Sequence, residues 1–243
     1  MIKHCIALAA RKGGVGKTTV ACGLASVLSS QDHQTLVIDL DPQSNSAYVL
    51  GVDPTKSGTA ALLMNGTMPE PLKVSETLSV LPGGPELTSH SVQNLHPEDL
   101  ADAVQGLDYE VLILDCPPGN EHLERLALVA ATAVLVVADA HPLAVIGAGR
   151  VINDLEASKR KGRRGAKRWA IVQSRIDLRR SLDRALEDQL KQAYPQTPRL
   201  VVHQDTNLSL AAADRTPITL YAPECRGVND LSTVARWVLD GET

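Results

Sequence analysis

The chain has 243 residues, of which 44% are hydrophobic and 21% charged, a balance typical of a folded protein rather than a disordered one. With two Trp, four Tyr and no Phe, we expect an aliphatic core and no platform of exposed rings for single-stranded nucleic acid. No apolar run reaches the roughly 18 residues that suggest a membrane span, the first residues lack the layout of a signal peptide, and the four cysteines show no CxxC spacing. We therefore expect a reduced, cytoplasmic, soluble protein without a disulfide framework or a zinc site.

The net charge of −4 is unevenly distributed along the chain. Residues 1–158 carry 8 basic and 18 acidic side chains, and residues 185–243 carry 5 and 8. Residues 159–184 carry 11 basic and 2 acidic side chains. A local basic block on an acidic chain is typical of a site for a polyanion.

Short apolar runs alternate with helical segments along the whole chain. Strands are expected at 4–10, 35–40, 78–81, 111–115, 133–138, 169–174 and 200–203, and helices at 18–30, 44–50, 59–64, 97–105, 121–131, 143–158, 181–192, 207–214 and 227–239. Because the strands are continuous apolar runs, the pattern predicts an α/β fold with a doubly wound, mostly parallel sheet and helices on both faces. No linker or repeat divides the sequence, so we expect a single domain over 1–243 that includes the basic block.

A glycine-rich segment at 11–19 (RKGGVGKTT) separates the first expected strand from the first expected helix. Ligands of a doubly wound sheet bind at this end of the strands, where backbone N–H groups curl around a phosphate and the helix adds its positive end. In that arrangement Lys17 reaches the β- and γ-phosphates of a nucleotide, and the Thr18 hydroxyl ligates Mg²⁺. A strict GxxxxGK[ST] pattern fails, because Arg11 stands at its first glycine position.

The segment 12–19 resembles the deviant Walker A motif of the ParA/MinD family of ATPases, and within it the small partitioning ATPases of the Soj and ParF kind. The resemblance implies a P-loop ATPase that takes ATP and Mg²⁺. It also implies that Lys12 is the signature lysine, which reaches across a dimer interface to the partner's nucleotide as an arginine finger does in trans. The expected phosphate loop consists of Gly13, Gly14, Val15, Gly16, Lys17, Thr18 and Thr19.

Two further motifs follow expected strands. Residues 37–43 (VIDLDPQ) are similar to the family's DxDPQ segment, which implies that Asp41 orients or activates the attacking water and that Asp39 helps to hold the magnesium shell. Residues 111–119 (VLILDCPPG) have the pattern of a Walker B strand, whose Asp115 holds Mg²⁺ through water. Taken alone, aspartates at strand ends are equally typical of helix caps and turns.

Residues 169–176 (WAIVQSRI) are similar to the sixth-strand region of the family, where a polar side chain often meets the adenine base. Gln173, Ser174 and Arg175 are the candidates for this contact. A plain strand end with polar turn residues fits the same pattern equally well. Adenine rather than guanine is implied by the family alone.

The basic block suits a homodimer that binds nonspecific double-stranded DNA, because phosphate contacts give salt-sensitive affinity and dimerisation doubles their number. We therefore expect a nucleoid-associated ATPase with slow intrinsic turnover that drives plasmid or chromosome partitioning. Its expected partner is a ParB-like centromere-binding or cargo-adaptor protein that stimulates hydrolysis. Since the phosphate loop begins at residue 11, no helix-turn-helix extension and no operator-specific autoregulation are expected. The candidate DNA contacts are Lys159, Arg160, Lys161, Arg163, Arg164, Lys167, Arg168, Arg179, Arg180 and Arg226, with Arg175, Arg184, Arg199 and Arg215 as further candidates.

Three alternative functions use the same phosphate loop. A ParA-like ATPase that positions a cargo other than DNA on the nucleoid has the same sequence features. A membrane-surface regulator resembling MinD needs a basic amphipathic helix at the C-terminus, whereas residues 231–243 contain one basic side chain and end in acidic sequence, so no membrane partner is expected. An ATP-dependent ligase needs a second substrate pocket, which nothing in the sequence marks.

Overall fold

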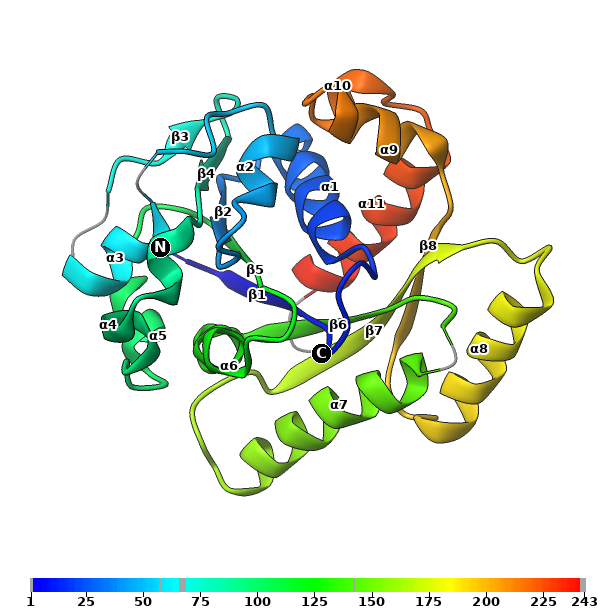
Figure 1. Cartoon of the computed structure of the whole chain (residues 1–243). Coiled ribbons are helices and arrows are strands. Elements are labelled where there is room, and N and C mark those ends of the chain that lie inside the picture. The colour runs from blue at the N-terminus through cyan, green and yellow to red at the C-terminus, as the bar shows by residue number, and fades with distance from the viewer. Residues whose placement is uncertain (1, 57, 66–68, 142, 241–243) are drawn as a thin grey trace.

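The computed structural model describes residues 2–56, 58–65, 69–141 and 143–240 (Figure 1). Within these residues the chain forms one sheet of eight strands in the order β3-β4-β2-β5-β1-β6-β7-β8. Neighbouring strands are parallel, except that β3 is antiparallel to β4. The strands are β1 (His4–Ala9), β2 (Thr35–Asp39), β3 (Leu72–Lys73), β4 (Leu78–Leu81), β5 (Val111–Asp115), β6 (Ala133–Ala138), β7 (Arg168–Ile176) and β8 (Arg199–His203).

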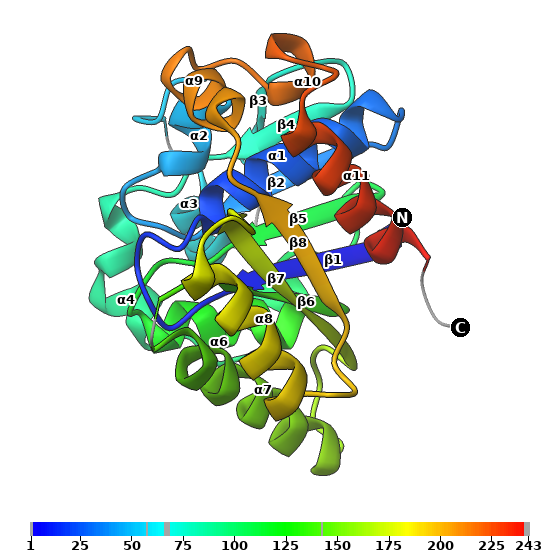
Figure 2. The ribbon, with the colours of Figure 1, turned by 90° about the vertical axis from the view of Figure 1, so that its right-hand side faces the viewer.

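Helices cover both faces of the sheet, as the two views show (Figures 1 and 2). One face packs against α1 (Lys17–Ser30) and α11 (Arg226–Leu239), with α2 (Asn45–Val49), α9 (Thr206–Ala213) and α10 (Ile218–Tyr221) beside α1. The other face packs against α3 (Thr59–Asn65), the 3₁₀ turn η1 (Pro85–Thr88), α4 (His90–Gln93), α5 (Asp99–Ala103), α6 (Glu121–Ala130), α7 (Ala144–Arg160) and α8 (Ser181–Ala193). The predicted doubly wound α/β fold is therefore confirmed.

The core consists of two aliphatic layers, one on each face of the sheet. Successive side chains of a strand point to opposite faces, so Ala7 and Ala9 of β1 join the α6–α7 layer while Ile6 and Leu8 join the α1–α11 layer. In the described part of the chain the largest fully buried side chains are all Leu or Ile. This confirms the aliphatic core that the shortage of aromatic residues predicts.

Every strand and helix that the sequence predicts is present, with ends shifted by a few residues. The largest shifts are of two residues: α5 is two residues shorter than expected at each end, and α7 and β7 each continue two residues beyond the expected end. The sequence analysis misses the two-residue edge strand β3, the turn η1 and the four-residue helices α4 and α10. These elements are too short to show a hydrophobic period.

Two sequence-based expectations concern membranes and cysteines. Across the described ranges, no helix combines the length and the hydropathy needed to cross a membrane. All four cysteines are free thiols, and Cys5, Cys22 and Cys116 are buried. Burial raises the pKa of each of these three thiols.

Candidate nucleotide-binding site

The phosphate loop joins β1 to α1 at the carboxyl edge of the sheet, where the parallel strands end. Gly16 has φ +93°, a left-handed backbone that favours glycine, and α1 begins at the next residue, Lys17. The hydroxyl of Ser174, at the end of β7, donates to the Val15 carbonyl and lies beside Gly16. Lys17 is only 6% exposed. The loop is therefore braced by β7, with its lysine enclosed.

Two buried aspartates end neighbouring strands next to this loop. Asp39 of β2 and Asp115 of β5 are paired in the register of the sheet. Ser46 bridges them, because its N–H donates to Asp39 Oδ2 and its hydroxyl to Asp115 Oδ2, each at 2.8 Å. The Oδ1 atom of Asp115 is buried and has no hydrogen-bond partner among the described residues. Carboxylate and hydroxyl oxygens are the donors that Mg²⁺ prefers, so these residues fit a magnesium ion with its water shell.

The electrostatics of the two aspartates favour a cation. Burial raises the pKa of both carboxyl groups, and repulsion by Asp115 raises that of Asp39 further. Hydrogen bonds from Thr18 and Ser46, together with the charge of Lys17, oppose the rise in the pKa of Asp115. A divalent cation at this place stabilises both ionised carboxylates.

Asp41, the residue expected to orient the attacking water, is held at the rim of the same site. Its N–H donates to Asp39 Oδ1 at 2.8 Å, and its own Oδ1 accepts from the Gln43 N–H at 3.0 Å. Gly83, from the turn after β4, packs so closely that a Cβ there would lie 2.0 Å from the Asp41 carbonyl oxygen. The backbone around Asp41 is thus fixed, and its catalytic role stays a prediction.

The signature lysine, Lys12, lies outside the enclosed part of the loop. Its side chain is 44% exposed, and its Nζ atom is 3.6 Å from Asp139 Oδ2, just beyond β6. The same oxygen accepts from Arg175 at 2.8 Å. In the monomer, the lysine expected to act on a partner's nucleotide is therefore held by an ion pair within its own chain.

All three candidates for the adenine contact are engaged within the chain. Gln173 is 1% exposed and donates to Glu187 of α8. Ser174 donates to the phosphate loop, and Arg175 has φ +57° and pairs with Asp139. Their contact with a base stays a prediction.

Arg11, which departs from the standard motif, ties the phosphate loop to two helices. Its guanidinium lies 3.4 Å from Glu121 and 3.2 Å from Glu124 of α6, and donates to Asp154 of α7 at 2.6 Å. Burial raises the pKa of Glu124, and the charge of Arg11 opposes that rise. The arginine thus neutralises a buried carboxylate and joins three elements.

The basic block at 159–184 is two surfaces rather than one. Strand β7, whose nine residues span roughly 30 Å, runs through the middle of the block. The strand separates cations that are close in sequence, and the contact of either group with DNA stays a prediction. We call Lys159, Arg160, Lys161, Arg163, Arg164, Lys167 and Arg168 the amino-edge block, and Arg175, Arg179, Arg180 and Arg184 the carboxyl-edge arginines.

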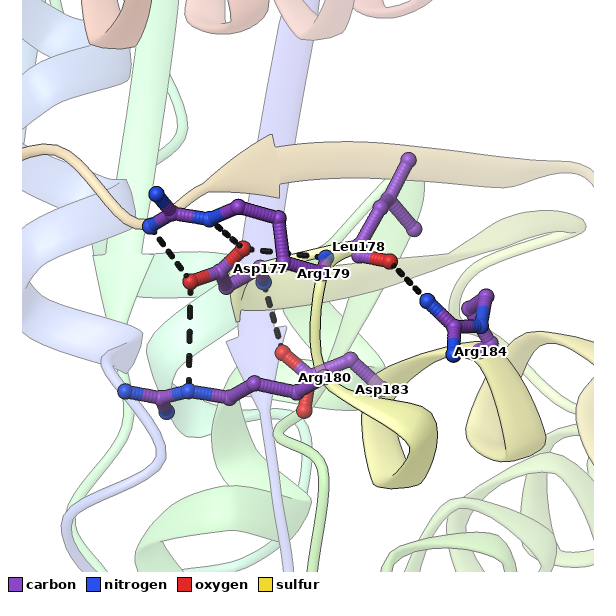
Figure 3. Close-up of polar contacts among 6 residues, drawn as sticks. All are labelled: Asp177, Leu178, Arg179, Arg180, Asp183 and Arg184. Carbon is purple, nitrogen blue, oxygen red and sulfur yellow. Dashed lines mark hydrogen bonds and ion pairs between the residues drawn. The ribbon is translucent and has the colours of Figure 1, made fainter.

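The carboxyl-edge arginines are partly neutralised by local contacts (Figure 3). Arg179 makes two hydrogen bonds to the carboxylate of Asp177, at 2.9 and 2.8 Å, and Arg180 approaches it at 3.9 Å. The hydrogen bonds from Arg179 lower the pKa of Asp177. Arg184 donates to the Leu178 carbonyl at 2.6 Å. Arg226 also lies towards this edge, because it is the first residue of α11. The N–H of the next residue, Gly227, donates at 2.8 Å to Asp205, which follows β8 by two residues.

The amino-edge block has both engaged and unengaged cations. Lys159 lies 5.5 Å from the Trp169 ring centroid, and Arg168 lies 4.1 Å from that of Trp237. Arg164 donates to an aspartate of α5 at 2.6 Å. Within the described ranges, no ion pair or side-chain hydrogen bond engages Arg160, Lys161 and Arg163, which are exposed.

Several site residues are missed by the sequence analysis. Ser46 and Asp139 belong to no motif, and their roles depend on the neighbours that the strand order gives them. Glu124 and Asp154 look like ordinary polar residues of helical segments. A doubly wound order would have placed Asp39 beside Asp115, but nothing in the sequence points to the serine that bridges them.

Comparison with known proteins places this site in a family. A family model described as an AAA domain matches residues 3–165. The chromosome partitioning protein ParA of Myxococcus xanthus is 29% identical over 250 residues, covering 98% of this chain and 88% of that protein. The chromosome-partitioning ATPase Soj of Thermus thermophilus is 30% identical over 236 residues, covering 96% and 94%. The chain therefore belongs to the AAA-domain family and, within it, to the ParA/Soj group of ATPases.

Solved structures share the fold. An ATP complex of McdA from Cyanothece matches with a TM-score of 0.80 at 19% identity, covering 98% of this chain and 96% of that one. MinD of Pyrococcus horikoshii with Mg-ADP matches at 0.78 and 22%, covering 97% and 96%. Cobyrinic acid a,c-diamide synthase of Mycobacterium smegmatis with ADP and magnesium matches at 0.80 and 22%, covering 99% and 97%. These structures hold adenine nucleotides, two of them with magnesium.

Proposed function

We propose that this protein is an ATP-driven dimerising switch that binds DNA without sequence preference and partitions or positions a cargo on the nucleoid. Two protomers associate when each holds ATP and separate after hydrolysis. A ParB-like protein on the cargo accelerates hydrolysis and so releases the dimer from DNA. The names of the ParA and Soj relatives support this reading.

The residues of the site have separate tasks in this proposal. The backbone N–H groups of the loop and the Lys17 ammonium hold the β- and γ-phosphates. Thr18, Asp39 and Asp115 would hold a magnesium ion, which offsets phosphate charge. Asp41 orients the attacking water, and Lys12 stabilises the transferring phosphoryl group in the partner's site.

The observation that carries the proposal is the contrast between the two lysines of the loop. Lys17 is 6% exposed and belongs to its own site, whereas the Lys12 side chain is 44% exposed at the protein surface. A lysine that completes a neighbour's site has to be accessible in the monomer. The ion pair with Asp139 has to open before Lys12 crosses the interface.

The C-terminal helix supports this proposal over a membrane-surface regulator. The apolar residues Leu231, Val234 and Val238 of α11 are all 0% exposed, and the helix packs against α1. An interfacial helix needs its apolar face free for lipid. The acidic end of the tail at 241–243 lies outside the described residues.

Sedimentation velocity and phosphate release test the switch together. Wild-type protein is expected to dimerise with ATP and not with ADP. Lys12→Gln should bind ATP as a monomer, without dimerisation and with at least tenfold slower turnover, while Asp41→Ala should dimerise with ATP and lose roughly 10²–10⁴-fold in turnover. Lys73→Gln removes an exposed charge far from the loop and serves as the matched control. A Lys12→Gln protein that dimerises and hydrolyses like wild type contradicts the proposed role of Lys12.

A further inference from the structure

A groove of about 910 Å³ lies between α6 and α7. Its apolar lining includes Leu128 and Val129 of α6, Leu155 of α7 and Ala166 from the turn before β7. Six basic and four acidic side chains also line it. It extends from Arg11, beside the phosphate loop, to the amino-edge block.

The acidic side chains of the groove all lie beside arginines. Arg11 pairs with Glu121, Glu124 and Asp154. The fourth carboxylate, Glu98, lies 3.8 Å from Arg164. The contacts of all four carboxylates are therefore made by two of the six basic side chains, and the lining as a whole has two more positive than negative charges.

The remaining four cations are exposed and unmatched. Arg125 comes from α6, Arg150 from α7, and Lys161 and Arg163 from the turn that closes the groove. In the part of the chain that the structure describes, none of the four makes an ion pair or a side-chain hydrogen bond. Four exposed cations without a partner, around a groove whose lining is net positive, favour an anionic ligand with several spaced charges.

We propose that this groove binds the phosphate backbone of duplex DNA, with Arg125 and Arg150 as contacts on its two walls. The inference rests on the DNA binding proposed above and names where the DNA lies. The positive surface continues past the groove onto Arg160 and Lys159, which suits a long rigid polyanion more than a short acidic peptide. No Trp, Tyr or Phe ring is among the lining residues, so the groove offers no ring on which an unpaired base could stack.

The test uses the full-length chain, saturating ATP and Mg²⁺, and a fluorescent 24-base-pair duplex, titrated over a salt series. The double variant Arg125→Gln/Arg150→Gln is expected to bind at least tenfold more weakly at low salt, with the salt slope reduced by about 4, one unit for each of the four cations removed from the dimer. Lys56→Gln/Lys73→Gln removes the same charge from exposed positions elsewhere and should bind like wild type. Thermal melting and ATP affinity check that both variants are folded.

Each other outcome overturns the proposal in a recognisable way. If wild type binds DNA and the groove variant binds equally well with the same slope, the groove is not the DNA site although the protein still binds DNA. If wild type binds no duplex in any nucleotide state, the proposed function itself fails. If polyglutamate binding depends on Arg125 and Arg150 while DNA binding does not, the groove takes an acidic protein instead.

Discussion

At the scale of single residues, the site depends on which hydrogen-bond donors and cations stabilise its buried carboxylates. Asp39 accepts from the backbone N–H groups of Asp41 and Ser46, Asp115 accepts from the Ser46 hydroxyl, and Asp115 Oδ1 is left for a cation among the described residues. Glu124 is matched by Arg11 instead. The sequence motifs predict the two aspartates but not the Arg11 contacts, since an arginine at a glycine position has no role in the standard motif.

Arg11→Gln is expected to destabilise the protein. The substitution leaves Glu124 buried without its ion-pair partner, which costs about 2 kcal/mol for a pair that is partly open to solvent. Urea unfolding measures the change in the free energy of unfolding. The double variant Arg11→Gln/Glu124→Gln should recover at least half of the loss, because no unpaired charge remains. An Arg11→Gln protein as stable as wild type would show that the ion pair contributes nothing.

The raised pKa of Glu124 predicts a pH dependence. The Glu124 carboxyl group binds its proton more tightly in the folded state than in the unfolded chain, where its pKa is about 4.5. Protonation of Glu124 therefore stabilises the fold fully below that pH, and this stabilisation is lost as the pH rises through the folded-state pKa. Glu124→Gln does not titrate at this position. The stability of wild type relative to Glu124→Gln should therefore fall as the pH is raised from 4 to 8 in urea titrations. A difference in stability between wild type and Glu124→Gln that stays constant from pH 4 to pH 8 would contradict a raised pKa of Glu124.

At the scale of elements, the long strands and helices follow from the sequence, whereas close contacts between loops do not. Continuous apolar runs predict β1, β2, β5 and β6 to within a residue, because buried parallel strands leave that pattern. The Pro-Gly-Gly-Pro sequence after β4 is typical of a turn. That Gly83 there touches the Asp41 carbonyl depends on β4 lying next to β2, which no local pattern reveals.

Gly83→Ala tests this contact. A Cβ 2.0 Å from the Asp41 carbonyl oxygen forces the backbone apart, at a cost of about 2–3 kcal/mol. Gly147→Ala is the matched control, because a Cβ inside α7 would meet no atom closer than 3.9 Å. The control should gain about 0.5–1 kcal/mol from helix propensity. Chemical denaturation measures the free energy of unfolding of both variants. If Gly83→Ala is as stable as Gly147→Ala, the turn can move away from the Asp41 carbonyl at no cost.

At the scale of the whole molecule, the fold divides what the sequence presents as one basic block. Strand β7 runs from the amino edge of the sheet to its carboxyl edge, so the amino-edge block and the carboxyl-edge arginines lie at opposite ends of this strand. Among the carboxyl-edge arginines, Arg175 pairs with Asp139, the partner of Lys12, while Arg179 and Arg180 lie beside Asp177. Composition predicts a polyanion site but not its place, because the place depends on the strand order.

The most direct test of the account is the binding of nonspecific duplex DNA with ATP, with ADP and without nucleotide, over a salt series. The account predicts tight binding with ATP alone and a steep loss of affinity as the salt concentration rises, because a dimer makes twice the phosphate contacts of a monomer. Equal binding in all three nucleotide states would contradict the ATP switch. Absence of binding in every state would contradict DNA as the matrix on which this ATPase works.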